Sequence, residues 1–341
     1  MKLLRTIQKV PAGILLVPTI IGALIHTFCP QILEIGDPTQ SMFTAAGMQL
    51  CIGLLLFFTG TQLSLSQLGL VAKKGLPFLL VKYGVAYGAA LLFLSLFGQA
   101  GLLGVSFLAF AIAITSCNGA LYMGIIEPYG NSVDYALFGI LMMFSMPVLP
   151  MVLLNSANGG DINWMSIVSL LVPFIFGIVL GNIDPAIRDL FKSGNNCVLP
   201  FIGFQFGAVI NLAEAAKQIP QGILLTVLFY VISIVPLYFF DRKVLHGGGY
   251  ASVASCSVAG VALSIPMMAA SAAGIYEPFV ADAVSQLAMI MFITTFATPY
   301  ITKFFIQKNH VKTNAEIAAE AASQGDKVTP LSVDEVSEEA V

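Results

Sequence analysis

The sequence predicts an all-α membrane protein of about ten transmembrane helices, arranged as two inverted five-helix repeats whose fourth and ninth helices are broken. Three observations predict this fold class. Hydrophobic residues make up 57% of the 341-residue chain and charged residues only 10%, whereas a soluble domain is usually about one-quarter charged. Apolar runs long enough to cross a bilayer recur along the chain. Short motifs of the first half also return in the second half.

The predicted spans are separated by short connections rich in Gly, Pro, Asn and Asp, which are typical of helix ends. The first five spans cover residues 6–28, 41–63, 76–97, 102–126 and 134–154. The second five cover residues 165–183, 197–212, 222–240, 253–275 and 279–305. We therefore expect a first five-helix repeat at residues 1–155 and a second at residues 156–312.

The remaining residues, 313–341, form a polar and acidic tail. This segment has too little apolar surface to fold alone, so we expect it to be disordered. A short amphipathic helix near residues 315–322 is the alternative.

Matching motifs indicate the internal repeat. Residues 16–22 (LVPTIIG) return as 171–177 (LVPFIFG), so that Pro18 and Pro173 are 155 residues apart. Further matches follow in the same order, at 116–119 with 255–260 and at 127–129 with 277–279. Coincidence is the alternative, because Pro, Gly and Leu are common in membrane helices. A repeat with an odd number of crossings must enter the membrane from the opposite side, which makes the repeat inverted.

The positions of lysine and arginine predict the orientation, because these residues accumulate on the cytoplasmic side of a membrane. With the N-terminus inside, the inner segments hold all of these residues except Lys82, within a span, and Lys217, outside. We therefore expect both termini to be cytoplasmic.

The fourth and ninth spans are each interrupted by small polar residues, at 115–119 (TSCNG) and 254–260 (ASCSVAG). Unwound backbone is tolerated at membrane depth where it lines a buried or watery cavity, and the positive ends of the half-helices favour an anionic group. Close helix packing through small residues is the alternative. The candidate binding residues are Ser116, Asn118, Gly119, Ser255, Ser257 and Gly260.

Lys82 is the most informative single residue, because an ammonium group within a span marks a pathway or an ion pair by default. We expect it to bind a substrate carboxylate or to take part in proton coupling. Its stem could instead extend to the cytoplasmic interface, since Leu76 begins the predicted span nearby.

Four further polar residues are candidates. Gln62 and Asn211 lie in the matching second spans of the two repeats and either face the cavity or bridge helices. Glu277 and Asp282 either end a helix or pass protons from the outside.

Several function classes lack their sequence signals. The five cysteines form no CxxC pair, so we expect neither a metal site nor a disulfide framework. The chain contains no HExxH, G-x-S-x-G or GxxxxGK[ST] motif. We therefore expect no enzyme activity, no cofactor and no nucleic-acid partner. A secondary transporter of a small polar solute fits best.

The chain resembles the 2-keto-3-deoxygluconate permease family. The resemblance rests on residues 10–13 (VPAG), 16–30, 118–122 (NGALY), 180–185 (LGNIDP) and 247–249 (GGG), and it extends over about the first 305 residues. It implies proton symport of a small sugar acid, 2-keto-3-deoxygluconate, into a bacterium across the inner membrane. It also implies a bile-acid-symporter-like fold in which two broken helices cross at the site.

The chain departs from the family pattern at Thr115 and Asn211, where members carry acidic residues. The coupling ion and the exact sugar acid therefore stay open. A sodium-coupled carrier of another small organic anion is the alternative.

Overall fold

The computed structural model describes residues 13–63, 65–126, 128–130, 147–157, 164–245 and 247–314, together with residues 7, 134, 141 and 316. The regular elements within these residues are helices, so the all-α prediction is confirmed for this part of the chain. The α-helices of the first half are α2 (Gly13–Phe28), α3 (Thr39–Phe43), α4 (Met48–Thr61), α5 (Leu65–Phe97), α6 (Phe107–Thr115), α7 (Gly119–Ile126) and α9 (Val148–Ala157). Those of the second half are α10 (Trp164–Ile183), α11 (Pro185–Phe191), α12 (Gly194–Gly207), α13 (Leu212–Lys217), α14 (Ile219–Phe240), α15 (Tyr250–Ala254), α16 (Ile265–Ala272) and α17 (Val280–Lys308).

Short helical turns of other types connect these helices. The 3₁₀ turns are η1 (Pro30–Leu33), η2 (Ala45–Gly47), η4 (Gly260–Ser264) and η5 (Gly274–Phe279). A π-helical turn, η3 (Asp241–Leu245), continues α14.

Within the part of the chain that the structure describes, three helices are long and apolar enough to cross a membrane: Gly75–Phe97, Ile219–Leu245 and Gly274–Lys308. Shorter apolar helices cover Val17–Phe28, Met48–Thr61, Val148–Ala157, Leu171–Ile183 and Gly260–Ala272. The predicted fifth span falls within the described chain only at residues 134, 141 and 147–154. The tail beyond residue 316 and the chain before residue 13, apart from Ile7, lie outside it. The arrangement of ten spans as two inverted repeats stays a prediction.

Two helix starts differ most from the predicted ones. The second span was expected from residue 41, but α4 begins at Met48 because the backbone at Thr44 is extended, with ψ at 176°. Gly47 then packs closely on Ser41: a Cβ atom added to Gly47 would lie 1.7 Å from the carbonyl oxygen of Ser41. The third span was expected from residue 76, but α5 begins at Leu65. Its first turns contain several good helix formers, which extend the helix beyond the apolar run.

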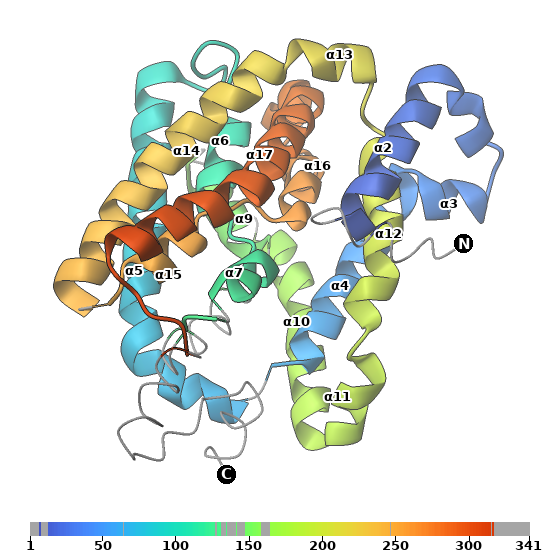
Figure 1. Ribbon diagram of the computed structural model, residues 1–341. Coiled ribbons are helices and arrows are strands. Elements are labelled where there is room, and N and C mark those ends of the chain that lie inside the picture. Colours follow the sequence, from blue (N-terminus) through green and yellow to red (C-terminus); the bar gives the residue numbers. More distant parts are fainter. Residues whose placement is uncertain are drawn as a thin grey trace.

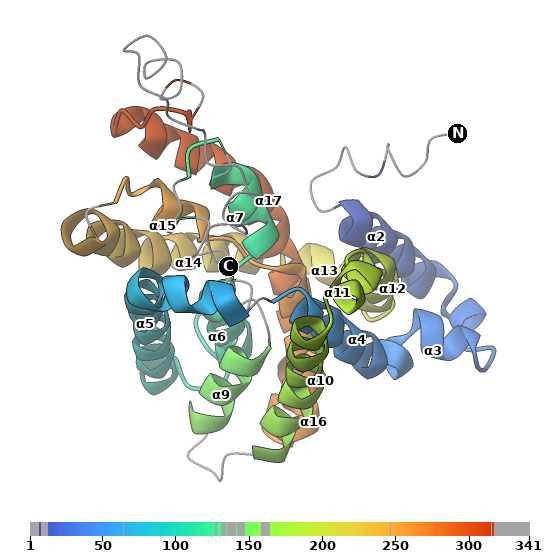
Figure 2. The ribbon, with the colours of Figure 1, turned by 90° about the horizontal axis from the view of Figure 1, so that it is seen from below.

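The helices form two groups, which stand side by side in Figures 1 and 2. One group contains α2, α3, α4, α10, α11 and α12, and the other contains α5, α6, α7, α9 and α14 to α17. In the first group, α2 packs along α12 and α4 packs along α10. In the second group, α14 packs against α5 and α17.

Glycines allow the helices of the first group to cross with their backbones in contact. Gly22 of α2 meets Gly207 of α12, and a Cβ on Gly207 would lie 2.0 Å from the carbonyl oxygen of Thr19. Gly60 of α4 meets Gly177 of α10, and a Cβ on Gly177 would lie 2.2 Å from the carbonyl oxygen of Phe57. We call these two contacts the glycine crossings. Small residues at such positions are typical of membrane helix pairs, because close approach increases van der Waals contact.

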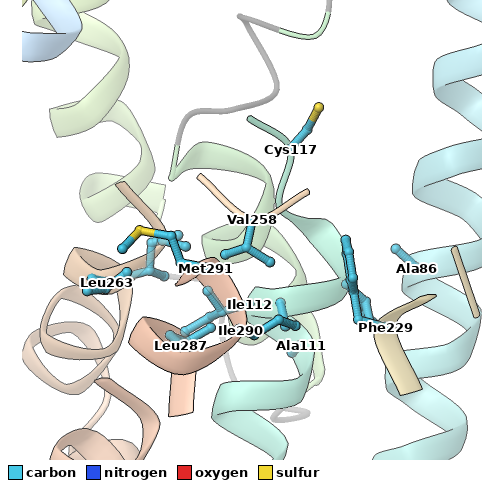
Figure 3. Close-up of a cluster of buried hydrophobic side chains, with 14 of the residues drawn as sticks. Ala86, Ala111, Ile112, Cys117, Phe229, Val258, Leu263, Leu287, Ile290 and Met291 are labelled. Atoms are coloured by element: carbon cyan, nitrogen blue, oxygen red, sulfur yellow. The ribbon is translucent and has the colours of Figure 1, made fainter. Parts of the chain in front are cut away.

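The second group surrounds a buried apolar core. Every residue of α6 is buried, and side chains from α5, α14 and α17 close around it. Figure 3 shows this packing, with Ile112 of α6 beside Ile290 of α17 and with Phe229 of α14 nearby. The core therefore fixes α6 from several sides.

The outer face of α14 carries a row of exposed apolar side chains. Ile223, Val227, Val231 and Val235 are each about half exposed and follow one another at helical spacing. We call this row the α14 ridge. Such a surface is unfavourable in water and suits contact with lipid.

Candidate functional site

The first helix break separates α6 from α7. Helix α6 ends at Thr115, and α7 begins at Gly119. Ser116 has extended backbone angles, with φ at −75° and ψ at 153°. The side-chain oxygen of Asn118 accepts a hydrogen bond from the N–H of Leu121 at 3.1 Å, which caps the start of α7. The structure thus has a helix interruption where residues 115–119 predicted one.

The second helix break separates α15 from η4. Helix α15 ends at Ala254, and η4 begins at Gly260 and leads directly into α16. Ala259 has extended backbone angles, with φ at −78° and ψ at 151°. This interruption also lies within the segment that the sequence predicted, residues 254–260.

The two breaks lie against each other. The backbone N–H of Asn118 donates to the carbonyl oxygen of Ser257 at 3.0 Å. In return, the N–H of Ala259 donates to the hydroxyl of Ser116 at 3.0 Å. Each break therefore satisfies polar groups that the other would leave unpaired in an apolar interior.

Lys82 of α5 points into this meeting point. Its side chain is 6% exposed, and its Nζ donates to the carbonyl oxygen of Ser255 at 3.1 Å. The thiols of Cys117 and Cys256, which are both buried, lie within its electrostatic reach. Lys82 thus lies at the break rather than extending along α5 to the interface.

Helix α17 supports the second break from its other side. The hydroxyl of Thr294 accepts a hydrogen bond from the N–H of Val258 at 3.1 Å. The hydroxyl of Thr298 donates to the carbonyl oxygen of Cys256 at 2.9 Å. Figure 3 shows Val258 directed into the apolar core beside α17. These contacts hold the backbone of the second break in one conformation.

Where the two breaks meet, which we call the crossing of the broken helices, Ser257 contributes a further polar group. The hydroxyl of Ser257 is buried and has no hydrogen-bond partner among the described residues. The hydroxyl of Ser255 donates to the carbonyl oxygen of Ser252 at 2.7 Å. The crossing thus combines a buried ammonium group, backbone polar groups and a spare hydroxyl. This chemistry suits a small anion that carries hydroxyl groups.

Comparison with known proteins identifies the family. A family model described as "2-keto-3-deoxygluconate permease" matches residues 4–311. The chain belongs to this family.

Two relatives show how far the similarity extends. The chain is 34% identical over 310 residues to 2-keto-3-deoxygluconate permease 1 of Salmonella typhimurium (strain LT2), which covers 90% of this chain and 96% of the relative. It is 30% identical over 314 residues to the 2-keto-3-deoxygluconate permease of Escherichia coli O7:K1 (strain IAI39), with 90% and 95% coverage. The chain is therefore a permease of the membrane and not an enzyme, and the resemblance found in the sequence is confirmed.

Two predicted binding residues of this permease lie at helix ends away from the breaks. The side-chain nitrogen of Gln62 donates to the carbonyl oxygen of Arg188 at 3.0 Å and so connects the end of α4 with α11. Asn211 is exposed, and its side-chain oxygen accepts a hydrogen bond from the N–H of Ala213 at the start of α13. Figure 1 shows α11 and α13 at opposite ends of the molecule. The structure therefore does not bring these two residues together.

The acidic candidates of the permease lie at its surface, whereas other carboxylates are buried. Glu277 in η5 and Asp282 in the first turn of α17 are both exposed. Asp134 and Asp241 are buried, at 7% and 6% exposure. Neither of these two was among the site residues that the sequence predicted. The signal for Asp241 was its place directly after an apolar run and shortly before three glycines.

Proposed function

We propose that this permease is a secondary active transporter that imports 2-keto-3-deoxygluconate, or a similar small sugar acid, together with protons. Its relatives are named for that sugar acid. The observation that carries the proposal is Lys82, a buried ammonium group whose hydrogen bond goes to a neutral carbonyl oxygen. A buried charge without an opposite charge is unfavourable, so the carboxylate of a sugar acid would stabilise it.

The binding residues would come from both breaks. Lys82 would bind the carboxylate, and the hydroxyl of Ser257 would bind a substrate hydroxyl, since it has no other described partner. The rest of the site would be lined by the other residues of the two breaks: Ser116, Asn118, Gly119, Ser255 and Gly260. The breaks favour a compact solute, because their backbones already lie within hydrogen-bond distance of each other.

We also propose the inverted repeat, with its halves at residues 1–155 and 156–312 and a separate tail at residues 313–341. The glycine crossings support it. Gly22 and Gly177 occupy the same place in the repeated motif, and they contact Gly207 and Gly60, which belong to the second predicted span of each half. A pseudo-twofold axis would convert one crossing into the other.

The proposed location is the bacterial cytoplasmic membrane with both termini inside. This orientation places Arg188 of α11 and the following Lys192 on the cytoplasmic side and Lys217 of α13 outside, in agreement with the charge rule. Glu277 and Asp282 would then lie towards the outside, where protons enter.

Uptake into proteoliposomes tests the function. We expect radiolabelled 2-keto-3-deoxygluconate to accumulate when the outside is made acidic, and to equilibrate without accumulation when no gradient is imposed. Accumulation that needs a sodium gradient at fixed pH would instead support the sodium-coupled carrier. Absence of uptake and exchange of this sugar acid under either gradient would reject the proposed substrate.

A further inference from the structure

Asp241 is a buried carboxylate that the binding site described above does not use. It begins the π-helical turn η3 and lies within the membrane-span candidate Ile219–Leu245. Its side chain is 6% exposed, and its Oδ2 atom has no hydrogen-bond partner among the described residues. Ionisable residues at such places are costly and are functional candidates by default.

The carboxylate of Asp241 holds the first half of the second broken helix. The backbone N–H groups of Gly249 and Ser252, at the start of α15, lie against it. Gly247 gives the turn its close fit, because a Cβ there would lie 2.0 Å from Oδ1 of Asp241. Gly249 adopts a φ of 77°, which favours glycine. Gly247 and Gly249 therefore allow the chain to turn closely past this carboxylate.

A short series of polar contacts connects Asp241 with Lys82. Ser252, whose backbone N–H lies against Asp241, accepts through its carbonyl oxygen a hydrogen bond from the hydroxyl of Ser255 at 2.7 Å. The carbonyl oxygen of Ser255 in turn accepts from Nζ of Lys82 at 3.1 Å. A movement of α15 at Asp241 would therefore also move the carbonyl oxygen of Ser255, to which Lys82 donates.

A second buried carboxylate faces the same half-helix. The hydroxyl of Tyr250, the first residue of α15, donates to Oδ2 of Asp134 at 2.6 Å. Asp134 repels Asp241 electrostatically, and the hydroxyl of Tyr122 on α7 donates to the backbone oxygen of Asp134. Within the described chain, Asp134 and Tyr122 interact electrostatically with Asp241, Tyr238 lies against Gly249, and the neighbouring Arg242 is exposed. Two buried negative charges favour the uptake of a proton by one of them.

We propose that Asp241 is the carboxylate that binds the coupling proton, an inference that rests on the proposed function. One proton adds to the free Oδ2 atom and converts the carboxylate into a carboxyl group, with no bond broken. The neutral group attracts the N–H groups at the start of α15 more weakly than the carboxylate does, so α15 and Ser255 can shift relative to Lys82. Release of the proton on the inside restores the carboxylate and the first position of α15.

The Asp241→Asn variant separates proton coupling from substrate binding. In proteoliposomes we expect it to keep the exchange of internal for external 2-keto-3-deoxygluconate and to lose the accumulation driven by an acidic outside. The matched control is Asp189→Asn, the same change at an exposed residue of α11, which should accumulate substrate as the unmodified protein does. Accumulation by Asp241→Asn at the unmodified level would overturn the proposal. Failure of the unmodified protein to exchange this sugar acid would instead reject the proposed substrate.

A second measurement does not depend on the folding of a variant. A hydrophobic carbodiimide modifies protonated carboxyl groups in apolar surroundings, and mass spectrometry locates the modified residue. We expect modification of Asp241 in the unmodified protein to increase as the pH falls and to inactivate accumulation in parallel. No modification of Asp241 at any pH at which the protein transports would contradict the proposal.

Discussion

Two kinds of helix crossing occur in this permease, and they depend on different chemistry. At the glycine crossings, unbroken helices touch through their backbones, and the absence of a side chain is what permits the contact. At the broken helices, the contact depends on hydrogen bonds between side chains and backbone groups that no helix satisfies: Ser116 and Thr294 accept from backbone N–H groups, and Thr298 and Lys82 donate to carbonyl oxygens. The first kind should therefore be sensitive to added volume, and the second to the loss of a polar atom.

The largest expected effect is that of Lys82→Met, which removes the charge and keeps most of the volume. We expect the rate of 2-keto-3-deoxygluconate uptake to fall more than about tenfold, because loss of a buried charge contact costs about 2 to 5 kcal/mol and about 1.4 kcal/mol corresponds to tenfold. Lys192→Met, at an exposed position after α11, is the control. Unchanged uptake by a properly inserted Lys82→Met protein would remove this residue from the mechanism.

The next largest effect should be on stability, at the glycine crossings. Gly207→Ala and Gly177→Ala would each force two helices apart, and overpacking typically costs about 1 to 3 kcal/mol. Thermal unfolding in detergent measures this change. Gly53→Ala and Gly88→Ala are matched controls in α4 and α5, because nothing lies within 4 Å of a Cβ at either position. If all four variants melted together, the close contacts would not stabilise the fold.

A smaller effect is expected at the supported break. Thr294→Val keeps the shape of the side chain but leaves the N–H of Val258 without its acceptor. Hydrogen bonds between membrane helices contribute about 0.6 kcal/mol on average and at most about 1.7 kcal/mol, so the melting temperature should fall slightly. Thr295→Val is the control, since that hydroxyl bonds to the carbonyl oxygen of Met291 in its own helix. Equal losses for the two variants would argue against a specific role of Thr294.

The smallest effect is expected at the start of the tail, which belongs neither to the glycine crossings nor to the broken helices. Hydrogen bonds from the backbone and the side chain of Thr313 hold the pKa of the Glu316 carboxyl below its usual value. A lowered pKa means that this contact is present at neutral pH and is lost as the pH falls through the lowered value. Glu316→Gln should therefore speed hydrogen exchange near residue 313 at neutral pH, relative to the unmodified protein, and leave uptake unchanged. A loss of uptake would show that the start of the tail acts on transport.

The sequence predicted what depends on local composition. The small polar residues at 115–119 and 254–260 indicated both interruptions, because such residues weaken a helix within an apolar run. The all-α class followed from hydropathy and charge. Both features can be predicted without knowing which segments of the chain contact each other.

The sequence could not decide what depends on contacts between distant segments. It left open whether Lys82 enters the site or extends to the interface, since this depends on how far α5 continues before residue 76 and on the position of Ser255. Gln62 was a candidate for the cavity or for a helix bridge, and its bond to Arg188 depends on α11 lying beside the end of α4. Asp241 was missed because it precedes Arg242 and Lys243, which are typical of a cytoplasmic connection.

The α14 ridge has a practical consequence for anyone who purifies this permease. Its exposed Ile and Val side chains must be covered by acyl chains or by detergent at every stage. Helices α11 and α13, at opposite ends of the molecule, then become the surfaces that an antibody fragment can reach. A fragment raised against either end would add the water-exposed mass that particle alignment or a crystal lattice requires.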